Sequence, residues 1–196
     1  MFPSGALAWA YLPFLATFLL SGAVLAQSAV PPPTPAVETW VPVHGDTLLV
    51  DTDANIGRLE HADGTALTFR VVTGAHGYVH YIGRTYDAST PKRVWAVRSI
   101  DTKWDRTTFG HKGIFLRLYD DPDTQTPYGI HAHRYGDKML ASDMRYRSMG
   151  CIIVSDDVLD VIERTYVVND GVLTVDTTAA IRDDVRTAMQ SVLPQQ

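Results

Sequence analysis

The stretch that decides the fold is YGIHAHRYGDKMLASDMRYRSMGCIIV, residues 128–154. It contains the only cysteine of the chain, Cys151, which lies between a glycine and a short apolar run typical of a strand. Two of the seven histidines, His131 and His133, precede this cysteine by about twenty residues. Because side chains repeat every two residues along a strand, both histidines are expected on one face of a strand Tyr128–His133. The pattern predicts one pocket that holds the thiol and both imidazoles.

This arrangement predicts a thiol nucleophile with a histidine base. A lone cysteine is most often a small buried apolar residue. A working cysteine needs a base or a nearby cation, because the free thiol is only slightly ionised at neutral pH. Histidine is the usual base, since its pKa lies near neutral pH. We predict Cys151 as the nucleophile, with either His131 or His133 as the base. The predicted oxyanion and substrate contacts are Arg147, Ser148, Met149 and Gly150.

Composition bounds the other function classes. The chain has 196 residues, 45% of them apolar, and a formal charge of -5. It therefore lacks the basic surface that nucleic-acid binding requires. A single cysteine makes neither an internal disulfide, nor a CxxC redox pair, nor a thiolate zinc site.

The N-terminal region predicts export. Residues 5–26 carry no charge and end in small residues before Gln27, the pattern of a cleaved signal peptide; a retained anchor is the alternative. A proline-rich linker is expected over residues 27–39 and the catalytic domain over residues 40–196. The domain is thus expected in the periplasm or outside the cell, with no stable membrane association once the leader is cleaved. Free thiols are uncommon in exported proteins, which favours a working cysteine.

Short runs of β-forming residues between turn signals predict a mainly β, sandwich-like domain with one or two helices. A polar loop is expected over residues 134–148. Ser155 is expected to cap a helix, and a second helix is expected near the C-terminus, Ala179–Leu193. The predicted strands are Thr47–Asp51, Arg58–Ala62, Leu67–Val72, Tyr78–Tyr86, Arg93–Arg98, Gly113–Tyr119, Tyr128–His133 and Val172–Val175.

The central stretch resembles a known signature. Tyr128-Gly129-Ile130-His131, followed after sixteen residues by Ser148-x-Gly150-Cys151-Ile152, is similar to the motif of the L,D-transpeptidase (YkuD-like) catalytic domain. That motif places a strand histidine before Ser/Thr-His-Gly-Cys. Weaker similarity extends over roughly residues 45–176, including the Thr-Gly and Thr-Pro pairs that flank two strands.

The chain departs from this motif at three positions. Met149 stands where the family usually has a histidine, Ile153 where it has Arg or Asn, and Ala132 where it has glycine. The resemblance favours His131 as the base, because Gly129-Ile130-His131 matches the strand of the motif. His133 also fits the spacing, so it is the alternative base or a replacement for the missing second histidine. The residues expected to make the polar contacts that Ile153 cannot make are Arg134, Tyr146 and Arg147.

The resemblance implies a peptidoglycan L,D-transpeptidase that forms 3-3 or 1-3 cross-links through an acyl-enzyme on Cys151. Its partners would be donor and acceptor stem peptides, and it implies no metal and no cofactor. The alternatives are hydrolysis by the same chemistry, as an L,D-endopeptidase or carboxypeptidase, and attachment or release of a lipoprotein. An inactive wall-binding module is a further alternative. A cysteine peptidase that acts on proteins has the least support.

Overall fold

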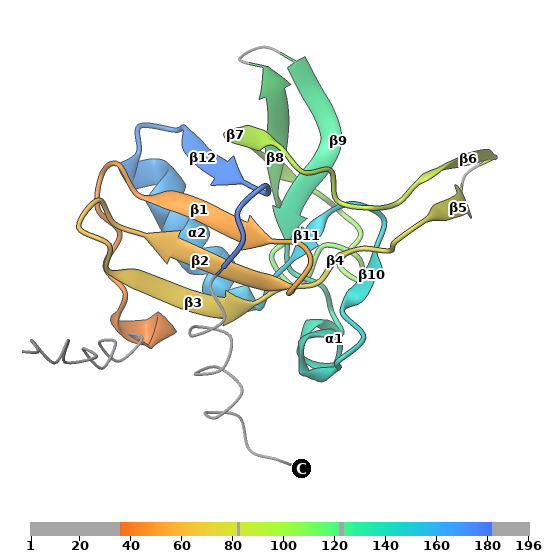
Figure 1. Ribbon diagram of the computed structural model, residues 1–196, viewed down its shortest axis with the longest axis horizontal. Coiled ribbons are helices and arrows are strands. Elements are labelled where there is room, and N and C mark those ends of the chain that lie inside the picture. The colour runs from red at the N-terminus through yellow and green to blue at the C-terminus, as the bar shows by residue number, and fades with distance from the viewer. Residues whose placement is uncertain (1–35, 82, 122–123, 182–196) are drawn as a thin grey trace, which may run out of the picture. The chain divides into compact units, whose positions relative to one another are not determined.

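The computed structural model describes residues 36–81, 83–121 and 124–181 (Figure 1). The predicted signal peptide, most of the predicted linker, and residues 182–193 of the predicted C-terminal helix lie outside these residues. The prediction of a mainly β fold is confirmed, because the described residues form twelve strands and two α-helices. No helix among them is long and apolar enough to cross a membrane.

Eight strands form one sheet that carries both the core and the site. Most neighbouring pairs are antiparallel, but β1 pairs with β12 in parallel and β11 pairs with β9 in parallel. In spatial order the strands are β11 (Ile152–Ile153), β9 (Thr124–His131), β8 (Ile114–Asp121), β7 (Val94–Thr102), β12 (Leu173–Asp176), β1 (Thr47–Asp51), β2 (Ile56–Glu60) and β3 (Ala66–Arg70).

Two small sheets complete the strand pairing. β4 (Thr73–Gly74) pairs in parallel with β10 (Tyr146–Ser148). β5 (Tyr78–Tyr81) and β6 (Arg84–Asp87) form an antiparallel hairpin, which projects away from the large sheet in Figure 1. The single strand expected over Tyr78–Tyr86 is therefore two paired strands, and Gly83, between them, has a positive φ of 72°.

The helix α2 (Asp156–Val168) closes the core against the large sheet. Ser155 caps it as predicted, because its Oγ accepts a hydrogen bond from the Val158 backbone N–H at 3.3 Å. One face of α2 packs against strand residues such as Leu48 and Leu59, both of which are buried. The predicted apolar stripe is buried in full and consists of Val158, Leu159, Val161 and Ile162.

Two predictions near the site are wrong in detail. The strand expected over Tyr128–His133 ends at His131, because the chain turns there and the Gly136 N–H donates to the His133 carbonyl at 2.8 Å. The polar loop expected over residues 134–148 contains the helix α1 (Gly136–Ala141) and the strand β10. The helix forms because Leu140 packs with Val72 and Ile153 in a small apolar cluster of its own. That contact is tertiary and leaves no periodic signal in so short a segment.

The domain begins near the end of the predicted linker. Val37–Thr39 form a single 3-10 turn, η1, and Val37 packs against the core. Trp40 follows, is buried, and stacks on His61 with the ring centroids 4.0 Å apart.

Candidate active site

Three neighbouring strands, β8, β9 and β11, bring two of the predicted site residues, Cys151 and His131, to one face of the sheet. Between β8 and β9, Arg117 lies opposite Gly129 and Phe115 lies opposite His131. Between β9 and β11, Ile153 lies opposite His131. Cys151 stands two residues before Ile153, so it takes the place beside Gly129. Because residues two apart point to the same face, Cys151 and His131 are diagonal neighbours.

These side chains line one cavity of about 530 Å³. It receives six of the seven predicted site residues: His131, His133, Arg147, Ser148, Met149 and Cys151. A second cavity, of about 380 Å³, also reaches the thiol. Its walls are Tyr81, Arg84, Tyr86, Pro127, Tyr128, Met149 and Cys151. Cys151 therefore lies where two cavities meet, with Met149, 45% exposed, beside it in both.

His131 is a buried, neutral imidazole. It is 3% exposed, and its ring packs against Phe109 and Phe115 at centroid distances of 5.1 and 5.8 Å. Burial lowers the pKa of His131 to about 4, although the carbonyls of Ala132 and Thr108 favour the charged form. Nδ1 lies 2.8 Å from the Ala132 carbonyl, which can only accept, so we assign the proton to Nδ1. Nε2 then carries the lone pair that a base needs.

His133 has different chemistry from His131. It lies beyond the end of β9 and is partly exposed. Its Nδ1 accepts a hydrogen bond from the Tyr135 backbone N–H at 3.0 Å. A neutral imidazole that accepts through Nδ1 carries its proton on Nε2. His133 therefore presents a donor where His131 presents a lone pair, which favours His131 as the base.

Cys151 is a protonated thiol in the resting site. Burial raises the pKa of Cys151 to about 11, against the opposing effects of the Gly129 backbone amide and the Arg117 charge. The pair is thus neutral thiol and neutral imidazole, not thiolate and imidazolium. Attack by the sulfur must then be coupled to transfer of its proton to a base.

The turn before the thiol is held by two hydroxyl groups. Ser148 Oγ donates to the Cys151 carbonyl at 2.5 Å and accepts from the Gly150 N–H at 3.2 Å. Thr90 Oγ1 donates to the Gly150 carbonyl at 3.0 Å and accepts from the Gly74 N–H at 2.9 Å. The Ser148 hydroxyl and the Gly150 N–H are thus occupied within the protein. The amides of Met149 and Cys151 are the oxyanion donors that this geometry favours.

Gly150 is required by its neighbour Tyr128. Its φ is +106°, a conformation that other residues rarely adopt. A Cβ at this position would lie 2.4 Å from Cε1 of Tyr128, whose ring packs edge-on against Trp95 at 5.9 Å. Gly150 is also the one predicted site residue that does not line the larger cavity. Because Gly150 has no side chain, its backbone can lie close to the Tyr128 ring.

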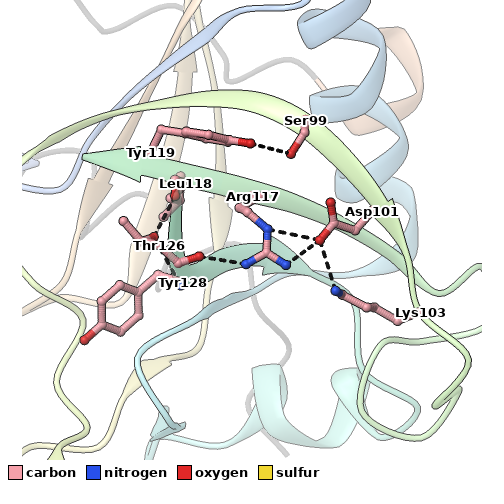
Figure 2. Close-up of polar contacts among 8 residues, drawn as sticks. All are labelled: Ser99, Asp101, Lys103, Arg117, Leu118, Tyr119, Thr126 and Tyr128. Carbon is pink, nitrogen blue, oxygen red and sulfur yellow. Dashed lines mark hydrogen bonds and ion pairs between the residues drawn. The ribbon is translucent and has the colours of Figure 1, made fainter. Parts of the chain in front are cut away.

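Two basic residues at the cavity were missed by sequence reasoning. Arg117 donates through Nε to Asp101 Oδ2 at 3.0 Å and through Nη1 to the Thr126 carbonyl at 2.7 Å, and its Nη2 also donates to Oδ2 (Figure 2). Lys103 Nζ donates to the same Oδ2 at 3.0 Å. Burial alone would raise the pKa of Asp101, but hydrogen bonds from Arg117 and Lys103 hold it below its ordinary value. A signal existed, because Leu116 and Leu118 face the core and leave Arg117 on the opposite face.

Of the other predicted polar contacts, only Arg147 reaches the cavity. Tyr146 packs on His76 with centroids 4.2 Å apart and donates its hydroxyl to the Asp53 carbonyl. Arg134 is exposed and lies over the Tyr135 ring. Within the part of the chain that the structure describes, no three His, Cys, Asp or Glu side chains gather as a metal site would require.

Comparisons with known proteins find distant similarity to solved structures. No protein-family model and no curated protein matches the chain. Among solved structures, the chain is similar to the L,D-transpeptidase of Xylanimonas cellulosilytica, with 20% identity and a TM-score of 0.48 over 74% of this chain and 63% of that one. It is similar to the L,D-transpeptidase of Enterococcus faecium, with 20% identity and a TM-score of 0.43 over 68% of this chain and 50% of that one.

A third similar structure is the helical cell shape determining protein of Campylobacter jejuni, with 17% identity and a TM-score of 0.47 over 76% of this chain and 53% of that one. The chain spans between half and two thirds of the length of these solved chains.

We expect Gly150→Ala to lower the free energy of unfolding by about 2–5 kcal/mol. The strained φ accounts for about 1–2 kcal/mol and overpacking against Tyr128 for about 1–3 kcal/mol more. Denaturant unfolding measures the loss. Gly77→Ala is the matched control, because Gly77 has a φ of +111° with nothing within 4 Å of the added Cβ. Equal losses in the two variants would contradict the role assigned to Tyr128.

The burial of neutral His131 predicts a loss of stability in acid. Its pKa is about 4 in the folded protein and 6.5 ordinarily, so between these values the unfolded chain binds a proton that the folded chain does not. The free energy of unfolding should therefore fall by about 3 kcal/mol as the pH drops from 6.5 to 4. Denaturant unfolding at several pH values in this range measures the dependence of the free energy of unfolding on pH. This pH dependence should be lost in His131→Gln and kept in a variant of exposed His44. If the free energy of unfolding of His131→Gln falls as steeply with pH as that of the wild type, His131 is not the group responsible.

Proposed function

We propose that the chain is a cysteine acyltransferase of the L,D-transpeptidase type, acting on peptidoglycan stem peptides. The observation that carries this proposal is the convergence of Cys151 and a neutral His131 on one face of three adjacent strands, in a cavity large enough for a peptide. Burial leaves the imidazole of His131 unprotonated at neutral pH, as a general base must be, while making it a weaker base than a free imidazole.

In the first half-reaction, the Cys151 sulfur attacks the carbonyl carbon of an L-centre that is followed by a D-residue. Nε2 of His131 takes the thiol proton as the S–C bond forms. The Met149 and Cys151 amides stabilise the oxyanion. The C–N bond then breaks, and the leaving amine takes the proton from the imidazolium. The acyl group stays on Cys151 as a thioester.

In the second half-reaction, the amine on the D-centre of a neighbouring diaminopimelate attacks the thioester. His131 takes the proton of that amine and returns it to the departing sulfur. The two cavities that meet at Cys151 support transfer between two peptides, because one can hold the acyl donor while the other holds the amine. Water in place of the amine would make the same site an L,D-endopeptidase or carboxypeptidase.

The charge of the site supports an anionic substrate. The chain has a formal charge of -5, yet the charged residues that line the larger cavity are Lys103, Arg117 and Arg147. Stem peptides carry carboxylates, which such a lining attracts. Their location in the cell wall agrees with export by the predicted signal peptide, residues 1–26.

An inactive wall-binding module is the second candidate. The raised pKa of Cys151 favours it, because the resting thiol is a poor nucleophile without its base. Turnover of a defined substrate decides between the two candidates.

We expect purified protein to convert a disaccharide-tetrapeptide dimer into new products that mass spectrometry identifies. A 3-3 bridge, a 1-3 bridge, and hydrolysis each give a distinct mass. Cys151→Ala should abolish every product. His131→Gln should lower the turnover number at least a hundredfold, the low end of what general base catalysis contributes, whereas His133→Gln should cost less. Wild-type yields from Cys151→Ala would rule the mechanism out, and no product from the wild type would favour the binding module.

Alkylation of the free protein tests the neutral thiol. With a pKa of about 11, the iodoacetamide rate of Cys151 should rise about tenfold per pH unit from pH 7 to 10 without levelling off. Glutathione serves as the reference thiol and levels off near pH 9, because its pKa is ordinary. Intact mass measured over time gives both rates. A plateau for Cys151 below pH 9 would mean that the thiol is not desolvated.

A further inference from the structure

The cavity that holds Cys151 has a surplus of positive charge in one wall. Lys103 and Arg117 share a single carboxylate, Asp101 Oδ2, so this cluster carries one net positive charge. Among the described residues that line the cavity there is no aspartate or glutamate to balance it. One carboxylate neutralises only one of the two cations, so the second is not explained by a structural ion pair. An uncompensated and partly buried cation costs free energy unless it acquires a partner.

The two cations differ in how many of their hydrogen-bond donors already have a partner. Arg117 is 14% exposed in its side chain, and all three of its nitrogens already donate, two to Asp101 and one to the Thr126 carbonyl (Figure 2). Lys103 is 29% exposed in its side chain, and its described hydrogen bond is the one to Asp101. An ammonium group has three donors. Lys103 is therefore the cation with donors to offer a ligand, while Arg117 and Asp101 hold it in place.

This cation cluster lies close to the reacting residues. Arg117 shares a row of the sheet with Gly129 and Cys151. Gly129 has no side chain, and a Cβ there would lie 2.3 Å from Cζ of Phe115, so the ring of Phe115 occupies that space. Lys103 Nζ and the Arg117 guanidinium lie 5.2 and 4.9 Å from the centroid of the same ring. That ring packs against His131 on its other contacts. One aromatic ring thus separates the surplus charge from the base.

We propose that Lys103, positioned by Asp101 and Arg117, is the subsite that binds a carboxylate of the acyl-donor peptide. The proposal rests on the proposed function, because it assigns the donor peptide to the cavity of Cys151. Three carboxylates of a stem peptide share this chemistry: the C-terminal one, the one on the side chain of diaminopimelate, and the free α-carboxylate of the γ-linked D-Glu. Binding any one of them would fix the register of the peptide against the thiol and so select the carbonyl that is attacked.

Binding is measured apart from turnover, in a Cys151→Ala background, by calorimetry. Four synthetic tetrapeptides, L-Ala-γ-D-Glu-diaminopimelate-D-Ala, serve as probes: one unmodified, and three in which the C-terminal carboxyl, the diaminopimelate side-chain carboxyl or the D-Glu α-carboxyl is replaced by its amide. Lys103→Gln removes the charge and Lys103→Arg keeps it. Lys112→Gln is the matched control, since Lys112 is in the same loop but pairs with Asp160 and does not line this cavity. Thermal melts confirm that each variant is folded.

Lys103→Gln should weaken binding of the unmodified peptide about ten- to a hundredfold, the value of a hydrogen bond to a charged group. Lys103→Arg and Lys112→Gln should stay within a few-fold of the parent. One of the three amidated peptides should bind weakly to the parent, with an affinity that Lys103→Gln does not change, and this peptide identifies the carboxylate. Equal affinities of the parent and Lys103→Gln for all four peptides, or no binding of any of them, would overturn the subsite.

Failure of the subsite and failure of the proposed function are distinguishable. Turnover is measured in protein that retains Cys151, with and without Lys103→Gln. If the two proteins turn over substrate with the same KM, the subsite is overturned and the acyltransferase proposal stands. If peptide binding depends on Lys103 but protein that retains Cys151 shows no turnover, the acyltransferase proposal is overturned. The subsite then stands as part of a wall-binding module.

Discussion

The pairing of two residues, Ile152 and Ile153, with β9 is the constraint on which the site depends. Ile153 is held from both sides: its N–H donates to the Val72 carbonyl at 2.8 Å, its carbonyl accepts from the Val72 N–H at 2.9 Å, and it lies opposite His131 in β9. The Val154 N–H donates to the His131 carbonyl at 3.1 Å. A slip of one residue in this register would turn Cys151 away from His131, because strand side chains alternate between faces. The hydrogen bonds of Ser148 and Thr90 to the Gly150 turn hold the segment before the strand, whereas the register of the strand itself comes from this pairing.

Burial gives the site its electrostatic character. A buried imidazole loses its proton and a partly buried thiol keeps its own, so both groups are neutral at neutral pH. The charged groups stand one ring further away, where Arg117 and Lys103 are tied to Asp101. This separation sets the two neutral groups apart from the cations that line the same cavity.

The departures from the family motif find partial explanations in the packing. Ile153, which stands where the family usually has a polar residue, joins Val72 and Leu140 in the apolar cluster that anchors α1. The cations of the cavity come instead from β8, the end of β7 and β10, as Arg117, Lys103 and Arg147. Met149, which replaces a histidine, remains exposed at the junction of the two cavities, and His133 presents its donor in the larger of them.

The sequence by itself determined the β architecture, the capped helix after Ser155, and six of the residues that line the cavity of Cys151, because alternation, turn glycines and capping residues act over a few neighbouring positions. It missed α1, whose formation depends on the packing of Leu140 against residues distant in the chain. The sequence favoured His131 over His133 as the base, and only the tertiary structure showed which backbone group each ring contacts. The pKa values, the cation pair at Asp101 and the position of Gly150 against Tyr128 were likewise decided by tertiary contacts. Desolvation and contact across strands depend on residues far apart in sequence, which no local pattern encodes.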